Sequence, residues 1–294
     1  MEDSKKSIIY NELKRFLKED ELIVDKETAK VYDCDGLATL ACEPMIVCLP
    51  KTAEQIQHIC RICSKHKVPI VARGAGTGLS AGATPVEGSV VLSTARFMDI
   101  VEIDAEARLA RVGPGVRNVS VSEAAKKFGL YYAPYPSSQL ACTIGGNVAE
   151  NSGGVHCLKY GLTVHNVLAV EMVTVEGELI KIGNTGHESF GPDLLAIING
   201  SEGMLGILTQ ITVKLLPIPQ KTRLVLAGFS TVSQAGQAVA SIIADGIIPA
   251  GLEMMDGPAI DAVAGYVQAG YPPDAKALLL CELDGEEADV ESLI

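Results

Sequence analysis

An apolar run at 68–72 predicts a short buried strand, and four glycines follow it within nine residues: Gly74, Gly76, Gly78 and Gly82. Glycine lacks a Cβ atom, so a turn of this composition can adopt positive φ angles and direct successive backbone N–H groups toward an anion. The chemistry that this stretch predicts is the binding of a phosphate or diphosphate group by backbone amides.

Two common phosphate-binding motifs can be compared with this stretch. Residues 76–81 fit the G-x-G-x-x-G/A fingerprint of dinucleotide-binding Rossmann folds, and Asp99 follows at about the expected 20 residues. A Rossmann motif opens a helix, whereas here further glycine and proline residues lead to another predicted strand at 89–93. A Walker loop requires Lys-Ser or Lys-Thr after its glycines, and neither pair follows. The residues favour a nucleotide-binding loop of another kind, with a plain glycine-rich surface loop as the alternative.

The elements before this loop predict an α/β unit. A strand at 45–50 ends at a proline, and Thr52 with Gln55 forms a capping box for a helix at 52–66. Strand, helix, strand and glycine loop are the opening pattern of such a unit. A peripheral helix at 4–18 precedes it, and the apolar residues predicted to share one face of that helix are Ile8, Ile9, Leu13, Phe16 and Leu17.

Short strands and turns continue the chain beyond the loop. Ser120 with Glu123 is predicted to cap a helix that runs to Phe128 and stops at Gly129. Glu176-Gly177 is typical of a hairpin turn. The other predicted elements are strands at 89–93, 100–103, 108–112, 167–175, 178–182 and 207–216, an irregular segment at 131–138 and a helix at 193–198.

A second domain is predicted after Pro217-Ile218-Pro219, the best candidate for a domain boundary. The order beyond it is strand, helix, strand, helix, strand, which is half of an α/β or α+β domain. The predicted elements are 223–229, 231–244, 247–254, 258–267 and 277–283, and a further helix begins at 286–293.

The eight cysteines include one close pair, Cys60 and Cys63. A zinc or iron–sulfur site normally requires four ligands at recurrent spacing, and this pair has no second pair to complement it. Both residues fall at core spacing in the predicted helix at 52–66, together with Ile56 and Ile59. We therefore interpret the two thiols as packing residues and predict no metal site.

The five histidines give no catalytic base. His58 and His66 lie in the helix at 52–66 and are interpreted as surface or half-buried residues. For His156 and His165 a structural role is favoured over catalysis, because neither has a carboxylate partner adjacent in sequence. His187 lies in a glycine-rich loop and is predicted to be solvated.

The composition bounds the class of protein. The chain has 294 residues, enough for two domains, and a formal charge of −12, which argues against a nucleic-acid partner. It contains neither an apolar run of the ~20 residues that span a bilayer nor an apolar export signal. We expect a cytoplasmic protein with reduced thiols, in which any membrane association would come through a partner subunit.

Two more glycine-rich stretches follow, at 143–154 and 200–206. Gly-Gly pairs beside Thr, Ser and Asn allow a planar or extended ligand to lie against the backbone. Three such stretches predict a long ligand bound between subdomains. The successive motifs of the chain lie at 69–82, 136–138, 143–154, 159–161 and 200–209. In their order and spacing the sequence resembles the FAD-binding (PCMH-type) domains of the vanillyl-alcohol oxidase superfamily. Within that superfamily it is most similar to the glycolate oxidase D subunit and FAD-linked D-lactate dehydrogenases.

The resemblance implies an α+β fold. A two-subdomain FAD-binding domain would occupy 1–219, with subdomains at about 1–113 and 114–219, and the first part of an α/β cap domain would occupy 220–294. Some relatives attach FAD covalently through a histidine in the first glycine loop. Thr77 occupies that position, so the resemblance implies non-covalent FAD. The residues implied to bind FAD are Arg73, Gly74, Ala75, Gly76, Thr77, Gly78, Leu79, Ser80, Pro136, Ser137, Ser138, Thr143, Ile144, Gly145, Gly146, Asn147, Ala149, Gly153, Gly154, Gly161, Val164, Glu202, Gly206 and Ile207.

The resemblance also implies an oxidoreductase that acts on a small 2-hydroxy acid such as glycolate or D-lactate. Hydride would pass to the flavin, and electrons would then pass to an iron–sulfur partner subunit or another acceptor. In the family the substrate-binding residues lie in the cap, of which this sequence holds only the beginning, so we expect the catalytic residues beyond Ile294. The alternatives are a flavin-binding electron-transfer module without its own substrate site and a remnant that binds no flavin.

Overall fold

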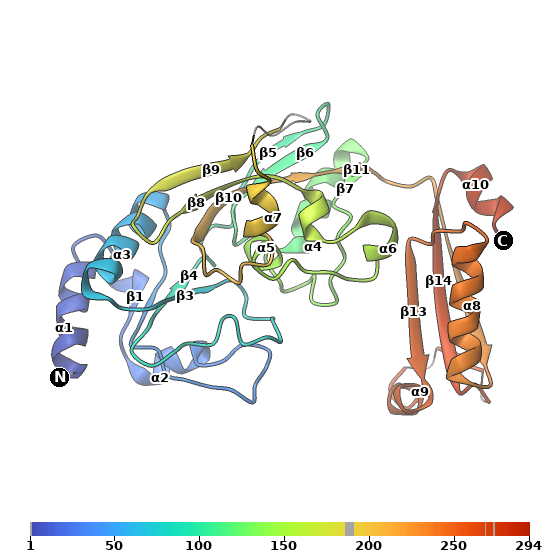
Figure 1. Cartoon of the computed structure of the whole chain (residues 1–294), viewed down its shortest axis with the longest axis horizontal. Helices are drawn as coiled ribbons and strands as arrows, with labels where there is room; N and C mark the ends of the chain where they lie inside the picture. Colours follow the sequence, from blue (N-terminus) through green and yellow to red (C-terminus); the bar gives the residue numbers. More distant parts are fainter. Residues whose placement is uncertain (1, 186–190, 268, 273) are drawn as a thin grey trace. The chain divides into compact units, whose positions relative to one another are not determined.

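The computed structural model describes residues 2–185, 191–267, 269–272 and 274–294 (Figure 1). They form two compact units. The first comprises Met1–Tyr132, Ser138–Ser152 and Thr163–Leu216, and the second comprises Ala133–Ser137, Gly153–Leu162 and Pro217–Ile294.

The first unit opens with the predicted α/β arrangement. Its first sheet contains, in spatial order, β1 (Leu22–Ile23), β2 (Ile46–Cys48), β4 (Val90–Ser93) and β3 (Ile70–Arg73). The last three run parallel, which requires a crossover between β2 and β3, and α3 (Ala53–His66) supplies it. The short strand β1 pairs antiparallel with β2 at the edge of this sheet.

Helix α3 begins and packs as the sequence predicts. Thr52 Oγ1 accepts from the Gln55 N–H and Gln55 Oε1 accepts from the Thr52 N–H, each at 3.3 Å, which confirms the capping box. Cys60 and Cys63 are buried on the helix face that covers the sheet, so their interpretation as packing residues is confirmed. No group of histidine, cysteine or acidic residues in the described ranges is arranged to hold a metal ion.

Helix α1 (Glu2–Leu13) is shorter than predicted and packs on α3. The predicted helix at 4–18 is wrong beyond Leu13, and Ile8 and Phe16 are exposed instead of sharing the buried face. The chain turns after Leu13, and the Phe16 ring stacks on His58 at a centroid distance of 4.0 Å. The stacked ring explains why Phe16 does not enter the core.

The second sheet of the first unit is antiparallel throughout. It contains, in spatial order, β5 (Ile100–Asp104), β6 (Leu109–Val112), β10 (Ile207–Lys214), β8 (Val167–Val173) and β9 (Leu179–Gly183). The predicted hairpin turn at Glu176-Gly177 joins β8 to β9. The shorter elements of the first unit include α2 (Lys26–Ala29), β7 (Leu130–Tyr131) and α7 (Leu194–Ile198), and β11 (Leu216–Pro217) begins at its last residue.

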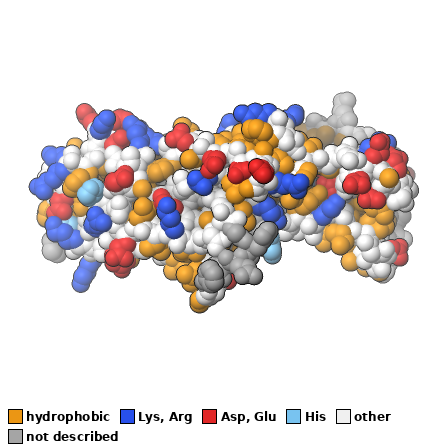
Figure 2. Space-filling model, turned by 90° about the horizontal axis from the view of Figure 1, so that it is seen from above, with side chains coloured by type: hydrophobic (Ala, Val, Ile, Leu, Met, Phe, Trp, Pro, Cys, Tyr) orange, Lys and Arg blue, Asp and Glu red, His pale blue; other side chains and the backbone are white. Residues whose placement is uncertain are grey.

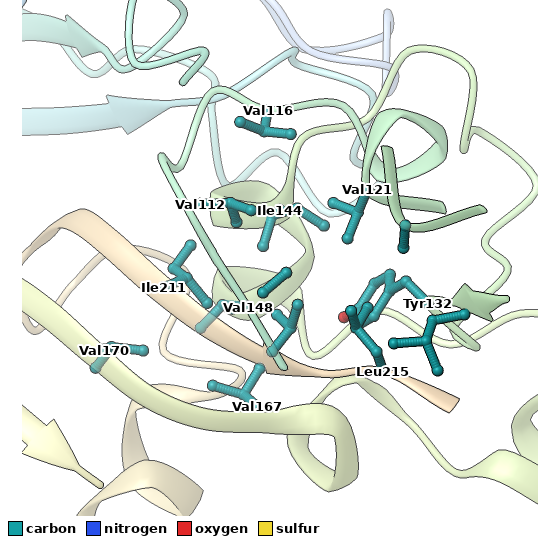
Figure 3. Packing of buried hydrophobic residues seen from close by; sticks show 14 of the residues in the cluster. Val112, Val116, Val121, Tyr132, Ile144, Val148, Val167, Val170, Ile211 and Leu215 are labelled. Atoms are coloured by element: carbon teal, nitrogen blue, oxygen red, sulfur yellow. The ribbon is translucent and has the colours of Figure 1, made fainter. Parts of the chain in front are cut away.

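Two helices cover the second sheet and form the core shown in Figure 3 with it. They are α4 (Asn118–Ala125) and α5 (Ile144–Glu150). The buried side chains labelled in Figure 3 are aliphatic apart from one tyrosine, and they come from both helices, the strands and the connecting segments: Val112, Val116, Val121, Tyr132, Ile144, Val148, Val167, Val170, Ile211 and Leu215.

The starts of these two helices differ from the sequence prediction. Helix α4 begins at Asn118 without a side-chain cap, so the predicted cap by Ser120 is wrong. Within α4, the hydroxyl of Ser122 accepts from the Tyr132 N–H at 3.0 Å. The sequence patterns predict no helix in the glycine-rich stretch 143–154. Helix α5 nevertheless forms there, because burial of its apolar residues outweighs the poor helix propensity of its glycines. Beyond α4, a 3-10 turn (Lys126–Phe128) continues to Gly129, which stops it as predicted.

The second unit is built on a three-stranded antiparallel sheet. Its strands are, in spatial order, β12 (Lys221–Phe229), β14 (Ala277–Gly285) and β13 (Gly251–Asp256). The sequence left two fold classes open for this part of the chain, α/β and α+β. The antiparallel pairing of the three strands identifies it as α+β. Strand β13 starts later than the predicted 247 because Gly246, at φ +78°, turns the chain there. The helices of this unit are α6 (Cys157–Tyr160), α8 (Val232–Ala244), α9 (Gly257–Ala264) and α10 (Glu287–Ser292).

Basic and acidic side chains are interspersed on the face drawn in Figure 2, where no continuous basic patch is seen among the described residues. No helix in the described ranges is long and apolar enough to cross a bilayer.

Candidate functional site

The loop after β3 presents a run of backbone donors. Within the described part of the chain, none of the N–H groups from Gly74 to Ser80 donates a hydrogen bond to a protein acceptor. The loop contains no helix before β4 begins, which confirms that it is not a Rossmann turn. Consecutive donors at the end of a strand are the arrangement that backbone nests use to bind anions.

Glycine is required in this loop by close packing. A Cβ atom on Gly74 would lie 2.5 Å from Thr143 Oγ1, and one on Gly78 would lie 2.9 Å from Glu150 Oε1. Gly76 has φ +69°, which residues with a Cβ rarely adopt. The same glycines that free the loop backbone therefore let α5 and the residue before it approach closely.

The Arg73 side chain binds backbone segments around this loop. Its buried guanidinium donates to the carbonyl oxygens of Cys34 at 2.7 Å and Ala83 at 3.3 Å, and it lies 5.5 Å from the centre of the Tyr32 ring. These bonds connect the chain on both sides of the glycines to the end of β3. Contact between the Arg73 side chain and a ligand stays a prediction.

The three glycine stretches of the sequence meet at α5. Gly74 packs against the start of this helix, as described above. At its other end, the N–H groups of Gly200 and Glu202 donate to Val148 O at 2.9 Å and Ala149 O at 2.8 Å. The first and third stretches are thus held on opposite ends of the second one. This convergence is the feature of the first unit that most resembles a binding site.

Several predicted contact residues belong to the second unit, and they form a local cluster there. Val155 N–H donates to Tyr135 O at 3.3 Å, and a Cβ atom on Gly154 would lie 2.7 Å from Pro136 N. The predicted residues in this unit are Pro136, Ser137, Gly153, Gly154 and Gly161, whereas Ser138 and Val164 lie in the first unit.

A polar cluster that the sequence analysis missed lies beside these residues, within the second unit. Lys159 Nζ contacts the Asp284 carboxylate and donates to Asp284 O at 2.6 Å, and Tyr160 OH donates to Asp284 Oδ2 at 2.6 Å. His156 Nε2 lies 3.6 Å from Glu282 Oε1. Strand β14 supplies both carboxylates. A spacing of 125 residues between Lys159 and Asp284 leaves no signal that a local pattern could detect.

Two family models match the chain. One describes an FAD binding domain and matches residues 44–183, and the other describes the C-terminal domain of FAD linked oxidases and matches residues 218–293. The chain belongs to the FAD-linked oxidases. Its fold and cofactor, which the sequence motifs imply, are thereby confirmed.

Relatives of this chain include a glycolate oxidase subunit GlcD of Escherichia coli, 55% identical over 271 residues that make up 92% of this chain and 54% of the relative. A D-lactate dehydrogenase of Archaeoglobus fulgidus is 36% identical over 86% of this chain and 58% of its own length. The chain thus spans somewhat more than half the length of these relatives. Among solved structures, an alkyldihydroxyacetonephosphate synthase superposes with a TM-score of 0.83 at 22% identity, over 98% of this chain and 57% of that one.

The residues of the first unit fit an FAD diphosphate through their backbone. The loop amides from Gly74 to Ser80 are available donors, since none of them donates to a protein acceptor among the described residues. Ile144, Asn147 and Ile207 are buried in the protein, so their predicted contact with FAD stays a prediction.

The predicted histidine roles have mixed outcomes. His66 Nε2 lies 2.9 Å from Glu12 Oε1, which agrees with a half-buried structural residue. His156 Nδ1 lies 3.0 Å from Ala133 O, and Glu282 is the carboxylate neighbour that its sequence surroundings do not supply. His187 lies outside the described residues.

Proposed function

We propose that this chain is the FAD-binding part of a flavoenzyme that oxidises a small 2-hydroxy acid such as glycolate or D-lactate. The observation that carries the proposal is the run of backbone donors from Gly74 to Ser80, held against α5, in a chain that belongs to the FAD-linked oxidases. The substrate class is supported by the names of two relatives, a glycolate oxidase subunit and a D-lactate dehydrogenase.

In this proposal the chain binds and orients the cofactor. Bound FAD supplies the acceptor for the hydride of the 2-hydroxy acid. Backbone amides of the first glycine loop hold the diphosphate, and Arg73 keeps that loop attached to the end of β3.

The proposal also includes a partner that accepts electrons. The Escherichia coli relative is named as a subunit, which supports a complex with at least one further chain. We propose an iron–sulfur partner subunit or another acceptor in this role, and we propose that any association with a membrane is made through that partner.

Two measurements test the proposal. The purified protein is titrated with FAD, and binding is followed by quenching of flavin fluorescence. The complete gene product, loaded with FAD, is then mixed anaerobically with glycolate, D-lactate or D-2-hydroxyglutarate, and the flavin absorbance near 450 nm is recorded. We expect bleaching with at least one of the three acids. No bleaching with any of them would refute the substrate class, and reduction only by a partner chain would favour an electron-transfer module.

We further propose that FAD is held without a covalent bond, because Thr77 stands where covalent relatives are expected to carry histidine. Acid precipitation of the loaded protein should leave the flavin in the supernatant. Yellow colour that remains with the washed, denatured pellet would contradict this expectation.

A further inference from the structure

Two glutamates lie against the first glycine loop. A Cβ atom on Gly82 would lie 2.5 Å from Glu202 Oε2 and 3.3 Å from Glu150 Oε1, so both carboxylates reach the same point of the loop. Within the described residues neither glutamate forms a salt bridge. Ser80 Oγ, 3.5 Å from Glu150 Oε2, is the one hydrogen-bond donor to the Glu150 carboxylate among the described residues.

A third carboxylate points to the same place and is almost fully buried. Asp35 is 6% exposed, and its Oδ1 accepts from the Leu37 N–H at 2.9 Å. Its Oδ2 has no hydrogen-bond partner in the described chain and would lie 3.9 Å from a Cβ on Gly78, next to Glu150. A buried carboxylate oxygen without a donor is costly, and such atoms are normally satisfied by a protein group, water or a ligand.

The charges of this group disfavour one another. Burial raises the pKa of Glu150, and the neighbouring charges of Glu202 and Asp35 raise it further. A diphosphate on the adjacent amides would add more negative charge to the same region. The three carboxylates would therefore repel the bound cofactor unless part of that cofactor donates hydrogen bonds to them.

We propose that Asp35, Glu150 and Glu202 form a hydroxyl-accepting subsite that binds a vicinal diol of FAD beside the diphosphate loop. The proposal rests on the proposed binding of FAD at this loop. Diols flank the diphosphate on both sides in FAD, as the ribose of adenosine and as the ribityl chain. A diol is neutral and offers two adjacent donors, which is the group that clustered carboxylates accept without further charge.

Other ligands fit the three carboxylates less well. Their arrangement is not one that holds a metal ion, as judged over the described residues. A second phosphate would be repelled by them. At Gly78 and Gly82, Glu150 and Glu202 occupy the place that a Cβ atom would take, so these two positions of the loop supply no side-chain donor.

The test measures how strongly the protein discriminates between FAD and two analogues. One analogue lacks the 2′ and 3′ hydroxyls of the adenosine ribose, and the other lacks the ribityl hydroxyls. A hydrogen bond to a charged group contributes enough that we expect one of the two analogues to bind about tenfold or more weakly than FAD. In Glu150→Gln and Glu202→Gln the ratio for that same analogue should fall several-fold, because a neutral amide is a weaker acceptor.

The control variant is Glu106→Gln, which changes an exposed glutamate in the turn between β5 and β6 of the same unit and should keep the wild-type ratio. Far-UV circular dichroism and the unfolding temperature show that each variant is folded. Equal affinity of wild type for FAD and both analogues overturns the proposal, as does an unchanged ratio in both glutamine variants. Tighter FAD binding by these variants at an unchanged ratio also overturns it and assigns the carboxylates a merely repulsive role. Failure of wild type to bind FAD at all refutes the proposed function itself and is recognised in the first titration.

Discussion

Replacing Gly145 with alanine would place a methyl group against Pro114 at the start of α5. The new Cβ would lie 2.6 Å from Pro114 Cβ and 3.0 Å from Pro114 O, both well inside van der Waals contact. Gly145 is buried, and its N–H donates to Pro114 O at 2.9 Å, so the two segments cannot separate without loss of that hydrogen bond. At the next residue, Gly146, the nearest atom to a Cβ would be Thr143 Oγ1 at 3.4 Å.

The two substitutions should therefore change stability in different directions. Overpacking of a close contact costs about 1–3 kcal/mol, whereas alanine in a helix gains roughly 0.5–1 kcal/mol over glycine. For Gly145→Ala the clash outweighs the gain, and we expect a net loss of about 1–2 kcal/mol. For Gly146→Ala the contact is ordinary, so the free energy of unfolding should stay unchanged or rise by up to about 1 kcal/mol.

Urea unfolding of the apoprotein, followed by far-UV circular dichroism, measures both values in the same helix. A loss of 1 kcal/mol corresponds to a decrease in Tm of about 2–4 °C for a unit of this size. The reasoning fails if Gly145→Ala is as stable as wild type, or if both variants lose the same amount. Since Gly146 is also a predicted FAD contact, Gly146→Ala should weaken FAD binding while it leaves the stability of the apoprotein intact.

Three further outcomes follow from buried polar and thiol groups. Asp284→Asn removes the charged partner of Lys159, which is partly exposed, and should lower the free energy of unfolding of the second unit by about 1–2 kcal/mol in urea. An unchanged free energy of unfolding would contradict a stabilising role of this ion pair. Burial raises the pKa of Cys60 to about 11 and of Cys63 to about 12, so peptide-resolved alkylation at pH 8 should be slow at both until urea unfolds the protein, and fast alkylation of the native form would oppose this. Burial raises the pKa of Glu21, but hydrogen bonds and a lysine outweigh it and lower the pKa below its usual 4.5. The stabilisation by ionised Glu21 is therefore present above pH 4.5 and is lost as the pH falls below it. Between pH 5 and pH 3 the free energy of unfolding should decrease less for Glu21→Gln than for wild type. Parallel plots of this free energy against pH for the two proteins would exclude the effect.

The parts of the fold that local rules determine could be predicted from the sequence. Helix α3 has its cap, its length and its apolar face within one continuous segment, and the hairpin from β8 to β9 has a two-residue turn signal between alternating strands. The parallel sheet followed from the order of these elements. For helix α3 and the hairpin, the energetic terms that decide the structure lie within about 20 residues of one another.

The remaining parts depend on contacts between distant residues. Helix α5 forms although Gly145 and Gly146 disfavour it, because its apolar side chains enter the core. Glycine spacing and order indicated the ligand site, yet nothing in the sequence near Asp35 indicated that its carboxylate meets Glu150 and Glu202. The Lys159–Asp284 pair could not be predicted from the sequence for the same reason, because the tertiary fold decides which charges are buried.

The strand order of the second unit has a consequence for synthesis on the ribosome. Strand β14 lies in the middle of its sheet and is the last of the three strands in the chain, so β12 and β13 have no partner until residue 285 has emerged. During that interval β12 exposes Leu224, Val225 and Leu226 together with unpaired backbone groups, which is the composition of an aggregation-prone edge. Nascent chains that stall before β14 are therefore expected to need a chaperone, whereas those that have passed it can close the sheet by themselves.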